Sequence, residues 1–177
     1  MKKGFTMIEL IFVIVILGIL ASVAIPRLAG TREDAEISSA IANLRTLISD
    51  AASYYVVKGE FGANTKWRDL TNVPLKDSNG NAIDSTAPAI GPDAPRYIEV
   101  GGKNCLLVGL RYSPTTTLGG YIALKPVDAN NNGACAKFLA TDSIRQLLES
   151  TLPADNECTG ANNGTLSCVA ISSGSIY

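Results

Sequence analysis

Apolar residues are distributed very unevenly along this chain. A nearly unbroken apolar run extends from Met7 to Ile25, and one carboxylate, Glu9, interrupts it near its start. As a helix, this run is long enough to cross a hydrocarbon core about 30 Å thick. Because Lys2 and Lys3 precede the run, the positive-inside rule places the N-terminus in the cytoplasm and the rest of the chain outside it. The pattern therefore predicts a single-pass membrane helix.

The segment from Arg27 to about Lys58 has the pattern of an amphipathic helix. Its apolar residues recur at steps of three and four and form one stripe, on which a globular domain can pack. The stripe consists of Ile37, Ile41, Leu44, Ile48, Ala51 and Tyr55. Gly59 directly follows Lys58 and is a typical helix stop. We therefore predict one long helix with a membrane half, 5–26, and an amphipathic half, 27–58.

Residues 59–177 are expected to form one small globular domain with a loop-rich connector, 59–95. The connector contains a helical turn at 66–70 and a turn or hairpin at Asn79–Gly80. β-branched and aromatic runs bounded by glycine and proline predict an antiparallel meander of strands. These strands lie at 96–100, 105–112 and 121–125, with a last strand at 168–172. Asp142 is expected to cap a short helix that ends near Thr151. The predicted fold class is α+β, a long N-terminal helix packed on a small antiparallel sheet.

The composition argues against catalysis and against nucleic-acid binding. The chain has no histidine, the commonest general acid–base residue, and its serines lie in loops without a nucleophile motif. The formal net charge is −1, which provides no basic surface for a polyanion. We therefore expect neither an enzyme nor a nucleic-acid partner.

The chain has four cysteines, and their spacing favours disulfides over a metal site. They are Cys105, Cys135, Cys158 and Cys168. A zinc site needs closely spaced pairs or histidines, and both are lacking here. An even number of cysteines outside the cytoplasm predicts disulfides, with three connectivities open. We favour Cys105–Cys135 and Cys158–Cys168, since the latter would close a polar loop with little apolar content to hold itself.

One segment has part of the pattern of a calcium loop. Asp128, Asn130 and Asn132 place oxygen ligands at positions one, three and five, and Gly133 follows at position six. Position twelve is Leu139, where such a loop needs a bidentate glutamate. The favoured interpretation is a polar turn before Cys135, so no cofactor is expected and calcium is kept as the alternative.

The N-terminal residues resemble a known processing site. The run from Lys2 to Leu10, Lys-Lys-Gly-Phe-Thr-Met-Ile-Glu-Leu, is similar to that of the type IV pilin superfamily, which comprises type IV pilins and secretion or DNA-uptake pseudopilins. The resemblance implies a leader, 1–4, that a prepilin peptidase removes after Gly4, and an N-methylated Phe5. It implies that Glu9 neutralises the terminal amine of a neighbouring subunit. Gly18 and Pro26 match a helix-loosening glycine and proline of the family.

The resemblance also implies a function and a location. It indicates a structural subunit of a type IV pilus-like or type II secretion pseudopilus filament, assembled with an ATPase and an inner-membrane platform protein. The subunit would start in the bacterial inner membrane and end in a periplasmic or cell-surface filament. A disulfide-bounded C-terminal region is also typical of the family. The alternatives are a monomeric membrane-anchored envelope binding module or a minor DNA-uptake pilin, with a secreted enzyme a distant third.

Overall fold

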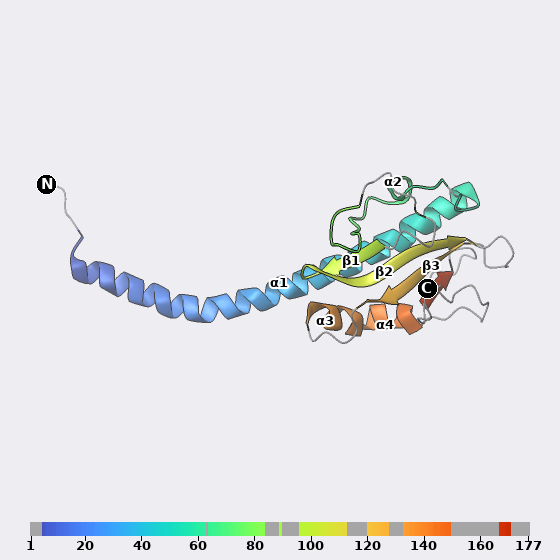
Figure 1. Ribbon diagram of the computed structural model, residues 1–177. Coiled ribbons are helices and arrows are strands. Elements are labelled where there is room, and N and C mark those ends of the chain that lie inside the picture. Colours follow the sequence, from blue (N-terminus) through green and yellow to red (C-terminus); the bar gives the residue numbers. More distant parts are fainter. Residues whose placement is uncertain are drawn as a thin grey trace. The chain divides into compact units, whose positions relative to one another are not determined.

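The computed structural model describes residues 5–62, 64–83, 89, 96–112, 120–127, 133–149 and 167–170 (Figure 1). The chain divides into two compact units, Met1–Ala35 and Glu36–Tyr177.

Helix α1 extends from Met7 to Lys58 and thus contributes to both units. Its assigned helical structure continues through Gly18 and Pro26 without a break. It ends at Gly59, which has a φ of 79° and whose N–H donates to the carbonyl of Tyr55 at 2.7 Å. A glycine in the left-handed region is a common way to end a helix, so the predicted stop at this position is confirmed.

The second unit contains an antiparallel sheet with strand order β1-β2-β3-β4. The strands are β1, Arg96–Val100; β2, Lys103–Tyr112; β3, Gly120–Pro126; and β4, Ser167–Ala170. The predicted meander and last strand are confirmed. Strand β2 begins at Lys103, earlier than the predicted Cys105. The reason is that Gly101 and Gly102, with φ of 62° and 73°, close a tight hairpin turn between β1 and β2.

One face of the sheet packs on the part of α1 that lies in this unit, and Figure 1 shows the strands running along that helix. The predicted stripe is confirmed, because Leu44, Ile48 and Ala51 are buried. The buried face is wider than the stripe, since Ala40, Leu47 and Ala52 are buried as well. The partners on the sheet are Leu106, Val108, Leu110, Ile122 and Leu124, all at most 1% exposed. The helix stripe therefore completes the core of the globular unit.

In the described part of the chain, short helices flank the sheet and the connector. Helix α2, Trp67–Leu70, is the predicted helical turn. Helix α3, Ala134–Ala140, was not predicted, and helix α4, Asp142–Glu149, begins near its predicted start. The carbonyl of Thr141 accepts the N–H groups of Ile144 and Arg145 at 2.9 Å each. Thr141 is therefore the N-cap position, and the prediction that Asp142 caps this helix was wrong by one residue.

Candidate functional site

The N-terminal end of α1 brings the side chains of Thr6 and Glu9 together. Glu9 Oε2 accepts hydrogen bonds from the Thr6 backbone N–H at 2.8 Å and from the Thr6 hydroxyl at 2.7 Å. The Glu9 N–H in turn donates to Thr6 Oγ1 at 3.4 Å. This reciprocal arrangement is a capping box. It gives the carboxylate partners within its own chain and satisfies amides that the first helical turn leaves free.

Thr6 is a site residue that our sequence analysis missed. The signal was present, because threonine followed three residues later by glutamate, ahead of an apolar run, is the sequence signature of a capping box. The resemblance drew attention to Glu9 alone and left its local partner unassigned.

The large apolar side chains that the structure describes in the first unit are exposed. Phe5 is 89% exposed and Leu17 is 58% exposed, and the large apolar side chains between them are 41–80% exposed. Of the described helices, α1 is the one that is long and apolar enough to cross a membrane, and its apolar stretch is not buried within the chain. A soluble monomer rarely exposes so large an apolar surface, so this segment requires lipid or another chain around it.

Gly18 and Pro26 lie inside this segment of α1. A Cβ at Gly18 would meet no heavy atom within 4 Å, so packing within the described chain does not require glycine there. Pro26 lacks an N–H and therefore cannot donate the usual helical bond to the carbonyl of Ser22. Both residues weaken the helix locally, although it remains continuous here. The predicted processing residue Gly4 lies outside the described residues.

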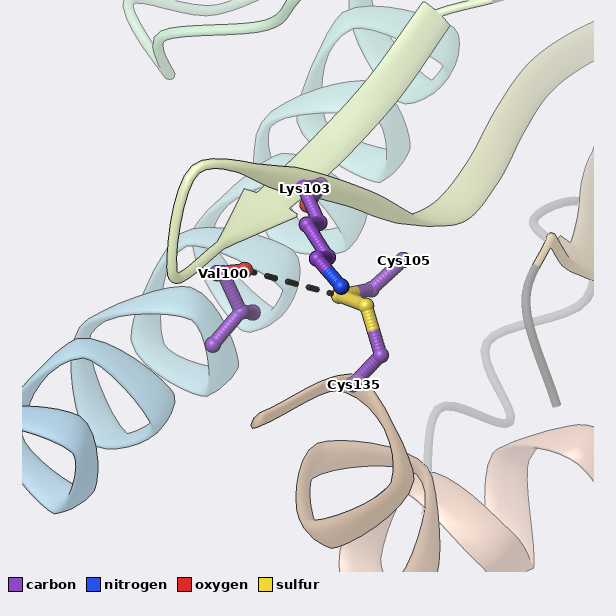
Figure 2. The surroundings of a disulfide bond; sticks show 4 residues. All are labelled: Val100, Lys103, Cys105 and Cys135. Carbon is purple, nitrogen blue, oxygen red and sulfur yellow. Dashed lines mark hydrogen bonds between the residues drawn. A yellow bond between two sulfur atoms is a disulfide. The ribbon is translucent and has the colours of Figure 1, made fainter. Parts of the chain in front are cut away.

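A disulfide joins Cys105 on β2 to Cys135 on α3 and confirms the first predicted pairing (Figure 2). The two Cα atoms are 5.1 Å apart, and both residues are at most 1% exposed. The carbonyl oxygens of Lys103 and Val100 lie 3.4 and 3.8 Å from Cys105 Sγ. Because this sulfur carries no hydrogen, these are close contacts and not hydrogen bonds. The bond attaches α3, which follows a polar segment, to the sheet.

The remaining site predictions fall largely outside the described residues. Cys168 lies on β4, but Cys158 is not described, so the second disulfide stays a prediction. The calcium candidates Asp128, Asn130 and Asn132 are also outside the described residues. Among the residues that the structure does describe, no group of three or more histidine, cysteine or acidic side chains could hold a metal ion.

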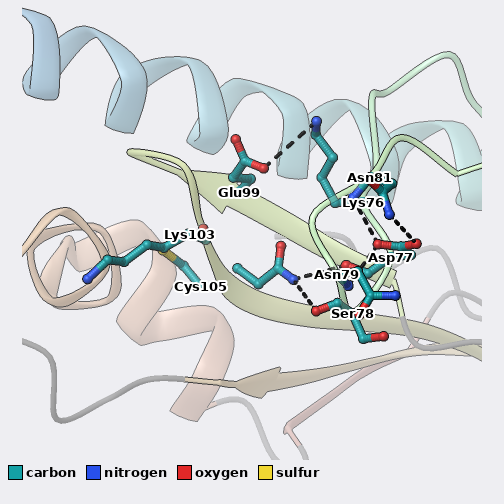
Figure 3. A network of polar contacts seen from close by, with 9 residues as sticks. Lys76, Asp77, Ser78, Asn79, Asn81, Glu99, Lys103 and Cys105 are labelled. Carbon is teal, nitrogen blue, oxygen red and sulfur yellow. Dashed lines mark hydrogen bonds and ion pairs between the residues drawn. The ribbon is translucent and has the colours of Figure 1, made fainter.

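Residues 77–81 of the connector form a polar turn (Figure 3). Asp77 Oδ1 accepts the backbone N–H groups of Asn79 and Asn81, both at 2.8 Å. The hydrogen bond from the Asn81 backbone lowers the pKa of Asp77, while desolvation opposes this shift. The Asn81 side chain, the Asn79 amide and the charge of Arg96 lower this pKa further. Just before the turn, the backbones of Lys76 and Tyr97 exchange two hydrogen bonds of 3.0 and 2.9 Å. Lys76 therefore pairs with strand β1 in an isolated antiparallel bridge.

Comparison with known proteins identifies the N-terminal segment. Residues 1–25 match the family described as the prokaryotic N-terminal methylation motif. The resemblance to the type IV pilin superfamily is confirmed. The matched segment contains Gly4, Phe5, Thr6 and Glu9, so the capping box of α1 lies within the methylation motif.

The similarity to individual pilin-like proteins extends beyond this motif. The chain is 36% identical to the type IV major pilin protein PilE1 of Neisseria gonorrhoeae over 121 residues, 63% of this chain and 64% of that one. It is 32% identical to the type II secretion system core protein G of Klebsiella pneumoniae over 100 residues, 56% and 62% of the two chains. It is 42% identical to a fimbrial protein of Neisseria meningitidis serogroup B over 77 residues, 43% and 45% of the two.

These matches leave part of each relative unaccounted for. The chain spans 45–64% of the length of the three relatives, which is less than two thirds of each. No solved structure matches the chain. The three relatives are a fimbrial protein, a type II secretion system core protein and a type IV major pilin.

Proposed function

We propose that this chain is a structural subunit of a type IV pilus-like or type II secretion pseudopilus filament. The observation that carries the proposal is the exposed apolar helix, which begins inside a methylation motif and has one carboxylate, Glu9, in its first turn. In this proposal the leader 1–4 is removed after Gly4, Phe5 is N-methylated, and the subunits polymerise through residues 5–26.

The apolar surface of the exposed helix is covered by lipid in the precursor and by neighbouring subunits in the filament. In the inner membrane the apolar side chains contact lipid, while Thr6 partly compensates the Glu9 carboxylate. In a filament the same side chains pack against neighbouring helices, and the carboxylate is taken out of water. An unpaired buried charge costs about 3–5 kcal/mol, so a cationic partner is required there. The methylated amine of Phe5 on a neighbouring subunit supplies that cation.

Assembly on this scheme needs several partners. A prepilin peptidase cleaves the leader, and an ATPase and an inner-membrane platform protein drive polymerisation. The precursor is a single-pass protein with a cytoplasmic N-terminus, and the filament is periplasmic or on the cell surface. No cofactor and no nucleic acid take part. The similarity to both pilins and a secretion core protein supports the filament class and leaves the particular machine to experiment.

Substitution of Glu9 tests this proposal. Glu9→Gln removes the charge and keeps the size and most of the hydrogen bonding. We expect the variant to insert in the membrane and to fold, but to be lost from filaments sheared from cells. Glu60→Gln is the matched control, because Glu60 is an exposed glutamate beyond the end of α1, and it should assemble normally.

The alternative of a monomeric anchored binding module makes the opposite prediction. Such a protein would tolerate Glu9→Gln and would retain Lys2 and Lys3. Normal filaments from the Glu9→Gln variant would exclude the proposed role of the carboxylate. Absence of filaments from the unmodified chain, with its residues 1–4 retained, would favour the anchored module.

A further inference from the structure

The turn at 77–81 contains a dipeptide with its own chemistry. Asn79 is followed by Gly80, and the missing Cβ of glycine lets the Gly80 nitrogen approach the Asn79 side chain more easily than any other residue would. We propose that Asn79 is a site of spontaneous deamidation and that Asp77 holds the reaction in check in the folded protein. This inference is independent of the proposed filament function.

The reaction requires only water. The Gly80 nitrogen loses its proton and attacks Asn79 Cγ, so that a new nitrogen–carbon bond forms. The bond between Cγ and Nδ2 breaks, and the side-chain nitrogen leaves as ammonia with the proton. Water then opens the five-membered imide at one of its two carbonyls, giving aspartate or isoaspartate at position 79. Atoms and charge balance without an oxidant or a reductant.

The site is open to this chemistry. Asn79 is exposed at the tip of the turn, and Figure 3 shows it beside Asp77 and Ser78. A Cβ at Gly80 would meet no heavy atom within 4 Å, so no residue beyond its chain neighbours crowds this side of the turn. Gly80 has a φ of 80°, which glycine adopts without strain. Water therefore reaches the Asn79 side chain in the folded protein.

The hydrogen bonds of the turn oppose the reaction. The Gly80 N–H donates to the Asp77 carbonyl at 3.1 Å, so the nucleophile must first give up this bond. The Asp77 carboxylate accepts the amides of Asn79 and Asn81 at 2.8 Å each and thereby fixes the backbone on both sides of the reacting bond. Its negative charge also disfavours loss of a proton from the adjacent Gly80 amide. Asp77 thus acts as a clasp on the reacting dipeptide.

Conversion of Asn79 would disturb the sheet edge that this turn holds. A new carboxylate at position 79 would lie beside that of Asp77, and isoaspartate would add a backbone atom to the turn. The Asn104 side chain donates to the Asp77 carbonyl at 2.9 Å, and Lys76 pairs with Tyr97 on β1. These contacts depend on the shape of the turn. Deamidation should therefore loosen the pairing between Lys76 and Tyr97.

Peptide mapping by mass spectrometry on the full chain in detergent micelles tests the proposal. The protein is aged at mildly alkaline pH, folded or unfolded in urea, and conversion of the Asn79 peptide is followed with time. We expect conversion in the folded protein to be roughly tenfold slower than in urea, the factor that corresponds to about 1.4 kcal/mol of lost hydrogen bonding. Asn79→Gln should abolish the conversion at position 79.

Two variants separate the clasp from general folding. Asp77→Ala should deamidate Asn79 several times faster than the unmodified chain when both are folded, and at the same rate when both are in urea. Asp69→Ala, at an exposed aspartate on α2, is the matched control and should leave the folded rate unchanged.

The proposal is overturned if the unmodified protein ages equally fast folded and unfolded, or if folded Asp77→Ala ages no faster than the unmodified chain. If Asp77→Ala does not fold, the rate of hydrogen exchange at the Gly80 amide is measured in the unmodified protein instead. Protection of that amide supports the clasp, and free exchange overturns it.

Discussion

The two units of this chain use the same helix in opposite ways. In the first unit the large apolar side chains that the structure describes are exposed, with Leu17 at 58%, whereas in the second Leu44 and Leu47 are fully buried against the sheet. The second unit therefore has a core of its own, and the first relies on lipid or on other chains. Apolar residues of equal hydrophobicity stabilise the fold in one unit and are available for assembly in the other. Truncation of an apolar side chain of α1 should therefore destabilise the globular unit where the side chain is buried and leave its stability unchanged where it is exposed.

The largest expected effect comes from truncating a buried leucine of α1. Leu44→Ala should lower the free energy of unfolding of the globular unit by about 3–5 kcal/mol, because it removes buried methyl groups and leaves a cavity. Leu17→Ala makes the same change at an exposed site and should leave this stability unchanged. Thermal unfolding of both variants in detergent measures the difference. Equal destabilisation by the two would contradict the division.

Removal of the Cys105–Cys135 disulfide should have the next largest effect. The double substitution of both cysteines by serine should cost about 3–4 kcal/mol, because the bond closes a long loop in the unfolded chain. Equilibrium unfolding in urea, with and without reductant, measures this cost. Reductant should break this bond in the unmodified protein, whereas the double variant has no such bond to lose. Unchanged stability would show that α3 is held by its packing alone.

A smaller effect is expected where α1 and β3 approach each other closely. A Cβ at Gly120 would lie 2.6 Å from Phe61 Cε2 and 2.8 Å from two ring atoms of Tyr55. Gly120→Ala should therefore destabilise the globular unit by about 1–3 kcal/mol through overpacking. Gly109→Ala is the matched control on β2, because a Cβ there meets nothing within 4 Å. If the two variants melt at the same temperature, this contact does not constrain the unit.

The smallest effect is a pH dependence that arises at Asp77. Hydrogen bonding lowers its folded-state pKa below the unfolded value of about 3.9, so its stabilisation is complete above that value and is lost as the pH falls through the folded-state pKa. The unmodified protein should therefore exceed Asp77→Asn in stability at neutral pH, and the difference should shrink in acid. Unfolding measured across this range checks the prediction, and a difference independent of pH would refute it.

Much of the fold could be predicted because the spacing of apolar residues indicates which face of a helix or strand is buried. The helix stripe and the four strands follow from it, since each needs one face covered. Helix α3 was missed because Ala134 to Ala140 is short and follows a polar run, and the Cys105–Cys135 bond helps to hold it in place. The start of β2 was placed too late because Lys103 and Asn104 are polar and do not belong to the apolar run, whereas the tight turn at Gly101 and Gly102 pairs them with β1.

The candidate site could be predicted only in part, for a different reason. Glu9 is conspicuous as a charge in an apolar run, but its partner Thr6 is recognisable only through the capping-box spacing. The Asp77 turn was predicted as a turn from its composition. The bonds from its carboxylate to two amides depend on backbone geometry, which composition does not specify.

The most direct test of the central claim is the intact mass of the protein from native membranes, measured with and without reduction. The account predicts a chain that begins at Phe5, carries one additional methyl group, and gains two hydrogens on reduction for each disulfide. A mass that retains residues 1–4, in cells with an active prepilin peptidase, would contradict it.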